Sequence, residues 1–86
     1  MEIKKQLVKR SIAGDVILVP VGSASLELKG LLTLNETGER IWDLLPECTD
    51  RDEIVRRLME EYDVDEATLR CDTNEFIDTL EKLDIL

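Results

Sequence analysis

The 86-residue sequence contains no histidine, the residue that most often serves as a general base or activates a serine or cysteine nucleophile. Its two cysteines, Cys48 and Cys71, lie far apart and form no CxxC pair, so they predict free thiols rather than a metal site. A Gly-rich phosphate loop and a G-x-S-x-G motif are also missing from the sequence. We therefore expect no catalytic residue, no cofactor and no bound metal.

Several acidic residues could still suggest a site. Glu60, Glu61, Asp63 and Asp65 stand close together, but the twelve-residue calcium loop with its central glycine is missing. Solvated helix ends and helix caps explain these carboxylates better. Asp72 differs from them because it flanks an apolar stripe, and two interpretations stay open for it: a structural hydrogen-bond acceptor, or part of a binding surface.

The net charge of −9 is unevenly distributed along the chain. Residues 1–30 contain five Lys/Arg and three Asp/Glu, whereas residues 31–86 contain six and seventeen. An acidic surface repels phosphate backbones and anionic lipid. No run approaches the roughly 20 apolar residues that cross a bilayer, and residues 1–10 are charged where a signal peptide is apolar. We expect one cytoplasmic domain over residues 1–86, with neither nucleic acid nor membrane as partner.

Three segments with strand character come first in the chain. Residues 7–12 mix polar and apolar side chains, and Gly14-Asp15 then supplies a hairpin turn with glycine where positive φ is needed. Residues 16–19 form an apolar, β-branched run that ends at Pro20. From Leu26 to Leu34 the even positions are mostly leucine, which is the period of a strand, with Gly30 as a possible break. Residues 21–25 are expected to form a loop.

The period changes to that of helices after residue 35. Asn35 is expected to cap a first helix that runs to Pro46 and places Trp42 in the core. Asp50 and Glu53 form a capping-box-like pair at the start of a second helix, and Asp65 begins a third. The positions expected to be buried are Ile54, Val55, Leu58, Met59 and Tyr62 in the second helix and Leu69, Thr73, Phe76, Ile77, Leu80 and Leu83 in the third.

Strands followed by helices predict an α+β domain in which helices cover one face of a three-stranded antiparallel sheet. Such a sheet has two edges with unpaired backbone N–H and C=O groups. An edge beside a helix can accept an extended peptide as an added strand, with ladder hydrogen bonds giving affinity and pockets against the helix giving selectivity. This mode of binding requires no catalytic residue.

The junction between the third strand and the first helix carries the most informative motif. L-N-E-x-G-x-x-I-W-x-L-L, at residues 34–45, resembles the signature of the PqqD family. The likeness continues in G-D-x-x-L-V-P-x-G at residues 14–22, E-I-V-x-x-L at residues 53–58, E-Y-D-V-D at residues 61–65 and D-x-x-x-F-x-x-x-L at residues 72–80. In order and spacing, the resemblance covers about residues 7–86.

The resemblance implies a winged-helix-like, non-catalytic peptide chaperone, a recognition element for the leader segment of a ribosomally synthesised precursor peptide. In such proteins the leader is similar to an added strand against the third strand and third helix. The complex presents the precursor to a modifying enzyme, such as a radical S-adenosylmethionine enzyme or a lasso-peptide protease. On this chain the peptide-binding residues implied are Leu31, Leu32, Thr33 and Leu34 on the strand and, from helical phase, Thr68, Leu69, Asp72, Thr73, Glu75 and Phe76 on the helix.

Three features depart from the family pattern. A glycine usual before the second helix is missing from Pro46–Thr49, and Asp84 stands near the end where the family often has glycine. The connection Ser23–Lys29 is also longer than usual, which could reshape the groove beside the third strand. The first two departures should affect helix ends, and the third should affect the choice of leader.

A winged-helix DNA-binding regulator is the alternative, because that class shares the general build. It requires basic residues clustered on one helix and a wing. The basic residues of the predicted helices are instead scattered among many acids: Arg40, Arg51, Arg56, Arg57, Arg70 and Lys82. An exposed strand edge also permits pairing between two copies of the chain, so a homodimer is a further expectation.

Overall fold

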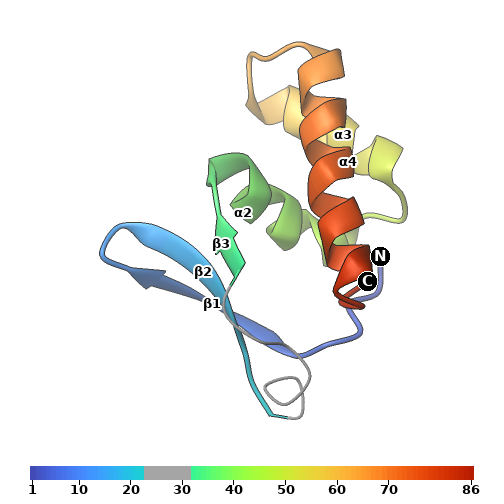
Figure 1. The fold of residues 1–86 in the computed structure, drawn as a ribbon. Helices are drawn as coiled ribbons and strands as arrows, with labels where there is room; N and C mark the ends of the chain where they lie inside the picture. The colour runs from blue at the N-terminus through green and yellow to red at the C-terminus, as the bar shows by residue number, and fades with distance from the viewer. Residues whose placement is uncertain (23–31) are drawn as a thin grey trace.

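The computed structural model describes residues 1–22 and 32–86, and it shows a small sheet beside a layer of helices (Figure 1). The antiparallel sheet has the strand order β1-β2-β3. Three α-helices follow it, which confirms the predicted α+β architecture. The elements are β1 (Leu7–Ile12), β2 (Asp15–Pro20), β3 (Leu32–Leu34), α2 (Glu36–Leu44), the short 3₁₀ helix η1 (Leu45–Glu47), α3 (Arg51–Glu61) and α4 (Glu66–Lys82).

Strands β1 and β2 form a hairpin with a two-residue turn. Ile12 pairs with Asp15, so the turn consists of Ala13 and Gly14, with φ of 52° and 87°. The prediction of a Gly14-Asp15 turn was therefore displaced by one residue. Two-residue hairpins favour positive φ at both central positions because that twist matches the flanking strands. The chain accordingly holds an alanine, as well as a glycine, in the left-handed region.

Strand β3 pairs with β2 through Leu34 opposite Val16 and Leu32 opposite Leu18. Leu34 is buried, Thr33 is exposed, and Leu32 is half-buried against the core, so the strand alternates as its sequence predicts. The expected strand start at Leu26 and the expected break at Gly30 lie outside the described residues, as does most of the expected loop at residues 21–25.

The three helices begin at the predicted caps. The side chains of Asn35, Asp50 and Asp65 accept hydrogen bonds from backbone N–H groups three residues later, at 2.7, 2.9 and 3.1 Å. Each bond satisfies an N–H that the first helical turn leaves without a partner. The Glu53 carboxylate accepts from the backbone N–H of Thr49 at 2.8 Å, where a capping box would have it accept from Asp50. This bond holds the pKa of Glu53 below its ordinary value.

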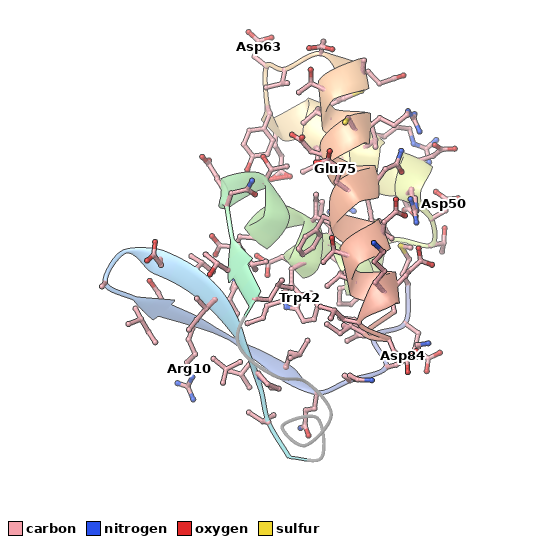
Figure 2. All side chains as sticks on the ribbon, in the orientation of Figure 1. Arg10, Trp42, Asp50, Asp63, Glu75 and Asp84 are labelled. Atoms are coloured by element: carbon pink, nitrogen blue, oxygen red, sulfur yellow. The ribbon has the colours of Figure 1, made fainter. Side chains whose placement is uncertain are left out.

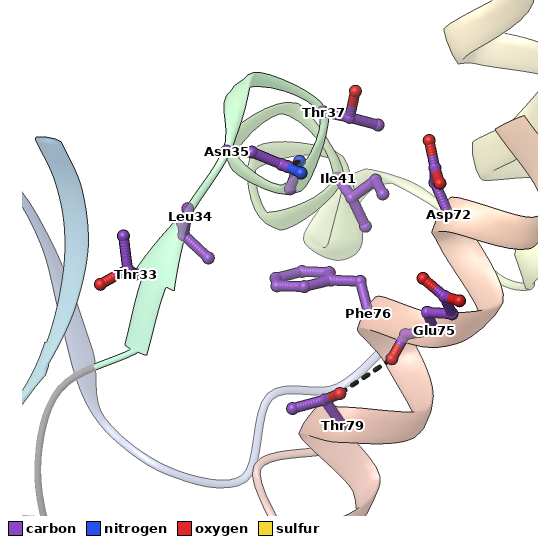
Figure 3. A pocket seen from close by; sticks show the side chains of 10 residues that line it. Thr33, Leu34, Asn35, Thr37, Ile41, Asp72, Glu75, Phe76 and Thr79 are labelled. Atoms are coloured by element: carbon purple, nitrogen blue, oxygen red, sulfur yellow. Dashed lines mark hydrogen bonds between the residues drawn. The ribbon is translucent and has the colours of Figure 1, made fainter.

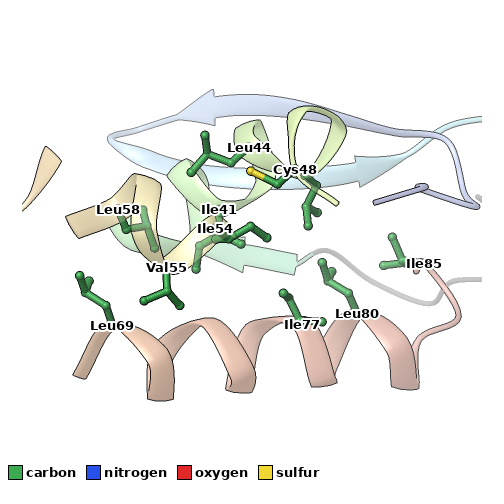
Figure 4. Close-up of a cluster of buried hydrophobic side chains, with 11 residues drawn as sticks. Ile41, Leu44, Cys48, Ile54, Val55, Leu58, Leu69, Ile77, Leu80 and Ile85 are labelled. Atoms are coloured by element: carbon green, nitrogen blue, oxygen red, sulfur yellow. The ribbon is translucent and has the colours of Figure 1, made fainter. Parts of the chain in front are cut away.

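A cluster of buried side chains joins all the helices (Figure 4). In Figure 4, Leu69, Ile77 and Leu80 point from α4 into this cluster, and Leu69 lies beside Val55 and Leu58 of α3. The half-buried Trp42 packs against the same cluster, so it is a peripheral core residue. The fully assembled cluster comprises Ile41, Leu44, Leu45, Cys48, Ile54, Val55, Leu58, Leu69, Ile77, Leu80 and Ile85.

Two residues expected in the core are exposed. Met59 is 43% exposed because the buried face of α3 is already occupied by Ile54, Val55 and Leu58, and Met59 lies beyond the edge of that face. Leu83 is 39% exposed because α4 ends there. Asp84 then adopts a φ of 58°, its N–H donates to the Glu81 carbonyl at 3.0 Å, and the Ile85 N–H donates to the Leu80 carbonyl at 2.8 Å.

These two bonds form a Schellman motif, with Asp84 at the left-handed position that usually favours glycine. The reversal of the chain places Ile85, which is 1% exposed, in the core position that the helical pattern had assigned to Leu83. Asp84 also lies 2.6 Å from Lys4 Nζ, and this contact lowers the pKa of its carboxyl. The helix end is therefore tied to the residues that precede β1.

Lys9 connects the sheet to α2. Its Nζ lies 3.0 Å from Glu39 Oε2 and 3.0 Å from Asp43 Oδ1. Hydrogen bonds to Glu39 and then to Asp43 raise the pKa of Lys9. These contacts tie α2 to β1. None of the described helices has the length and apolar character needed to cross a membrane.

Candidate functional site

A cavity of about 210 Å³ lies where β3, the first turns of α2 and one face of α4 meet (Figure 3). Elements from two separate parts of the chain form its walls. Residues 33 and 34 come from β3, residues 35–41 from the start of α2, and residues 72–79 from α4. The residues that line it are Thr33, Leu34, Asn35, Thr37, Gly38, Ile41, Asp72, Glu75, Phe76 and Thr79.

Strand β3 supplies the first wall and an open edge. The strand order β1-β2-β3 places β2 on one side of β3, and no other described strand lies on its second side. Figure 3 shows this second side turned towards α4. Backbone N–H and C=O groups along an open edge are available for pairing with another extended chain.

The start of α2 supplies the second wall, and its geometry depends on Gly38. The Gly38 N–H donates to Asn35 Oδ1, which holds the cap at the end of β3. A Cβ added at Gly38 would lie 3.1 Å from that oxygen and 3.7 Å from Phe76 Cε1. Glycine at this position therefore allows the strand-to-helix corner and the ring of Phe76 to approach each other closely.

Helix α4 supplies the third wall through residues spaced three and four apart. Asp72, Glu75, Phe76 and Thr79 share one face of the helix at this spacing. Phe76 is half-buried and reaches towards Leu34, while the carboxylates of Asp72 and Glu75 stand exposed beside it (Figure 3). Thr79 Oγ1 donates to the Glu75 carbonyl at 2.9 Å, so its hydroxyl is turned back to its own helix.

The cavity combines an apolar floor with a polar rim. Ile41 is fully buried, Leu34 is 6% exposed, and both lie with Phe76 beneath the opening. Cys71, on the neighbouring turn, is exposed, and its Sγ lies 3.9 Å from Glu75 Oε1. The described residues contain no group of three or more His, Cys, Asp or Glu able to hold a metal ion. The arrangement is suited to binding an extended chain.

The structure brings together five of the ten predicted site residues. Thr33, Leu34, Asp72, Glu75 and Phe76 line the cavity. Leu32 lies on β3 but is half-buried against the core, and Leu31 lies outside the described residues. The peptide-binding role of all these residues stays a prediction.

The remaining three predicted positions lie elsewhere on α4. Leu69 is 2% exposed and Thr73 is fully buried, so both face the core. Thr68 is exposed at the start of the helix, where its Oγ1 donates to Asp65 Oδ1 at 2.8 Å. The predicted surface therefore covered two neighbouring stripes of the helix, of which only the stripe of Asp72, Glu75 and Phe76 opens into the cavity.

Sequence reasoning missed the remaining lining residues. Thr79 follows Glu75 by four residues, so continuing the stripe by one turn would have found it. The other four, Asn35, Thr37, Gly38 and Ile41, lie within the strand-to-helix motif that the sequence had already singled out. That motif was interpreted as a corner and a core anchor, whereas it also forms a wall of the cavity.

An open strand edge that faces a helix across a cavity with an apolar floor and a polar rim is characteristic of domains that bind extended peptides by strand addition. The comparisons with known proteins agree with this class. The family model described as coenzyme PQQ synthesis protein D (PqqD) matches residues 16–86, and the chain belongs to this family. The family motif that the sequence shows at the corner thus coincides with a wall of the cavity.

A solved structure supports the same assignment. The chain is similar to a protein described as TbiB1 in complex with the TbiA(beta) leader peptide, with 30% sequence identity and a TM-score of 0.72. The similarity covers 100% of this chain and 94% of that chain. No curated protein matches the sequence.

Proposed function

We propose that this protein binds the leader segment of a ribosomally synthesised precursor peptide and presents the precursor to a modifying enzyme. The leader adds as a fourth strand to the open edge of β3, and its inward side chains enter the cavity between β3 and α4. The observation that carries the proposal is the open edge of β3 beside a cavity floored by Leu34, Ile41 and Phe76. Membership of the PqqD family and the likeness to a leader-peptide complex support it.

The protein takes no chemical step itself in this proposal. The sequence has no histidine, the residue that most often activates a serine or cysteine nucleophile. The chemistry therefore belongs to a partner, for which a radical S-adenosylmethionine enzyme and a lasso-peptide protease are the candidates. Because the leader is made on ribosomes, the encounter takes place in the cytoplasm. Among the described strands, β1 forms the other edge of the sheet, which we propose as a place for the partner or a second copy of the chain.

Single proline substitutions in β3 test the proposal. Consecutive strand residues direct their N–H groups to opposite sides, so Leu32→Pro and Thr33→Pro each remove one donor, one from the β2 ladder and one from the open edge. The variant that loses the open-edge donor should keep the far-UV circular dichroism spectrum of the wild type. It should bind a fluorescein-labelled leader at least tenfold more weakly in fluorescence anisotropy.

The matched control is the same pair of substitutions on β1, Arg10→Pro and Ser11→Pro. The control variant that remains folded should bind the leader with wild-type affinity, because β1 is separated from the cavity by β2. The leaders to test are those of precursor genes adjacent to the gene for this protein. Failure of every such leader to bind at micromolar concentration would contradict the proposal.

A further inference from the structure

The acidic residues of α4 divide into two groups according to the direction they face. Glu66, Asp78 and Glu81 are paired with arginines: Arg70 NH2 lies 3.8 Å from Glu66, and Arg51 NH2 lies 2.8 Å from Asp78 and 2.6 Å from Glu81. These ion pairs connect the helix to itself and to α3. The acids on this side of α4 are therefore neutralised within the protein.

The other two acids of the helix, Asp72 and Glu75, line the cavity. No lysine or arginine in the described part of the chain forms an ion pair with either carboxylate. The contact that Glu75 makes is with the Cys71 thiol at 3.9 Å, which carries no positive charge. Asp72 and Glu75 are thus the two acids of α4 that form no ion pair with a described lysine or arginine. Both line the cavity through which a bound chain would pass.

The apolar floor below these carboxylates restricts what kind of cation fits. The half-buried Phe76, next to the buried Leu34 and Ile41, offers an apolar surface that favours methylene groups or an aromatic contact, and the carboxylates stand at its rim. Lysine and arginine have this composition, because their aliphatic stems cover apolar surface while the charged end reaches polar groups. A small inorganic cation would leave the apolar floor uncovered.

We propose that the groove between β3 and α4 selects peptides with a lysine or arginine whose stem lies over Phe76 and whose charge is held by Asp72 and Glu75. This inference rests on the proposed function, and it adds a specificity determinant to it. In a strand added beside β3, alternate side chains face the helices, so the basic residue occupies an inward-facing position. The inward position one further along the peptide should be apolar, to cover the rest of the floor.

A selection experiment tests this inference without knowledge of the natural leader. A phage-displayed library of random dodecapeptides is selected on the wild-type protein and on the D72N/E75Q variant. The peptides selected on the wild type should share a lysine or arginine at a fixed spacing of two from an apolar residue. Those selected on the variant should keep the apolar residue and lose the enrichment of the basic one.

The matched control variant is D78N/E81Q, which removes the same charge from the arginine-paired side of α4. It should select the same basic peptides as the wild type, which separates a local contact from an effect of net charge. In a selected peptide made synthetically, replacing the basic residue by glutamine should weaken binding to the wild type about fivefold, the scale of an exposed ion pair. The same replacement should leave binding to D72N/E75Q unchanged.

The results separate this inference from the proposed function. Selected peptides that lose binding to the open-edge proline variant of β3 but show no preference for lysine or arginine would overturn the inference and leave the proposed function standing. A selection that yields no peptide dependent on the β3 edge would overturn both. The comparison of the basic peptide with its glutamine-substituted form is made on the wild-type protein, so this part of the test does not depend on the folding of any variant.

Discussion

Thr73 lies in the middle of α4 with its side chain fully buried. Its Oγ1 has no hydrogen-bond partner among the described residues. A buried hydroxyl without a partner loses its hydrogen bonds to water on folding and gains none in exchange. Thr73 therefore weakens the helical layer, although its methyl group packs where an apolar residue is needed.

The substitution Thr73→Val should raise the free energy of unfolding by about 1 kcal/mol, because it removes the unsatisfied hydroxyl and keeps a side chain of similar shape. Urea denaturation followed by circular dichroism measures the change. The control Thr73→Ser keeps the hydroxyl and loses the methyl group, so it should be less stable than the wild type. A valine variant less stable than the wild type would show that the hydroxyl has a partner in solution.

Thr73 also shows why the sequence located only part of the candidate site. The spacing of residues along α4 predicts which of them share a face, and this gave Asp72, Glu75 and Phe76 correctly as neighbours. It does not show where the core ends and the cavity begins, because Thr73 and Leu69 lie on the adjacent stripe, only about 100° away around the helix. Deciding between the two stripes requires the positions of α3 and β3.

At the scale of elements, the backbone of the hairpin turn is strained at Ala13. Ala13 has a φ of 52°, and the Cβ of an alanine in this left-handed region meets the following carbonyl oxygen at a cost of about 1 kcal/mol or more. Asparagine adopts the same conformation more readily, and Asn-Gly is the preferred pair for a two-residue hairpin. The sequence at this turn is therefore suboptimal for the structure that it forms.

The substitution Ala13→Asn should increase the free energy of unfolding by about 0.5 to 1 kcal/mol, since it relieves this strain. Gly14→Ala should decrease it, because Gly14 has a φ of 87°. Thermal unfolding followed by circular dichroism compares both variants with the wild type. Leader affinity should not change in either variant, because the turn lies at the end of the hairpin and contributes no residue to the cavity.

The sequence predicted helix starts better than it predicted the end of α4. Asn35, Asp50 and Asp65 were recognisable as caps because their side chains make a bond of known type at a fixed spacing. The end of α4 depends on Asp84 taking a left-handed conformation, which its residue type does not reveal. In this conformation Asp84 pairs with Lys4, which is distant in sequence. The burial of Ile85 in place of Leu83 could therefore not be predicted from the sequence around the helix end.

At the scale of the whole molecule, the excess of negative charge lies in the part of the chain that follows the hairpin, since residues 31–86 contain seventeen Asp/Glu and six Lys/Arg. Arg10 stands on the hairpin and points away from the helices, whereas Asp50, Asp63, Glu75 and Asp84 surround the helical layer (Figure 2). The net charge of −9 therefore comes mainly from the part of the chain that forms β3 and the helices, which also forms the cavity. Such a field attracts basic peptides from a distance and repels acidic ones before any contact forms.

This distribution predicts that ionic strength acts on the rate of association. A basic peptide should associate more slowly as NaCl rises from about 0.02 M to about 0.5 M, because salt screens the field over distances of about 10 Å at 0.1 M. Stopped-flow fluorescence with a labelled basic peptide measures the association and dissociation rates separately. The dissociation rate should change much less, since it depends on ladder hydrogen bonds, apolar contacts and a direct ion pair in the groove, and salt screens charges in contact less than charges far apart.

The D72N/E75Q variant distinguishes the long-range attraction by the net charge from the direct ion pair in the groove. Its net charge is −7 where the wild type has −9, so most of the attraction is retained and association should be slowed only slightly. Its dissociation should be several-fold faster, because the cation of the peptide has lost its partners in the cavity. If dissociation were unchanged and only association slowed, the two carboxylates would act as part of the general acidic field, and the basic residue of the peptide would have no specific position in the groove.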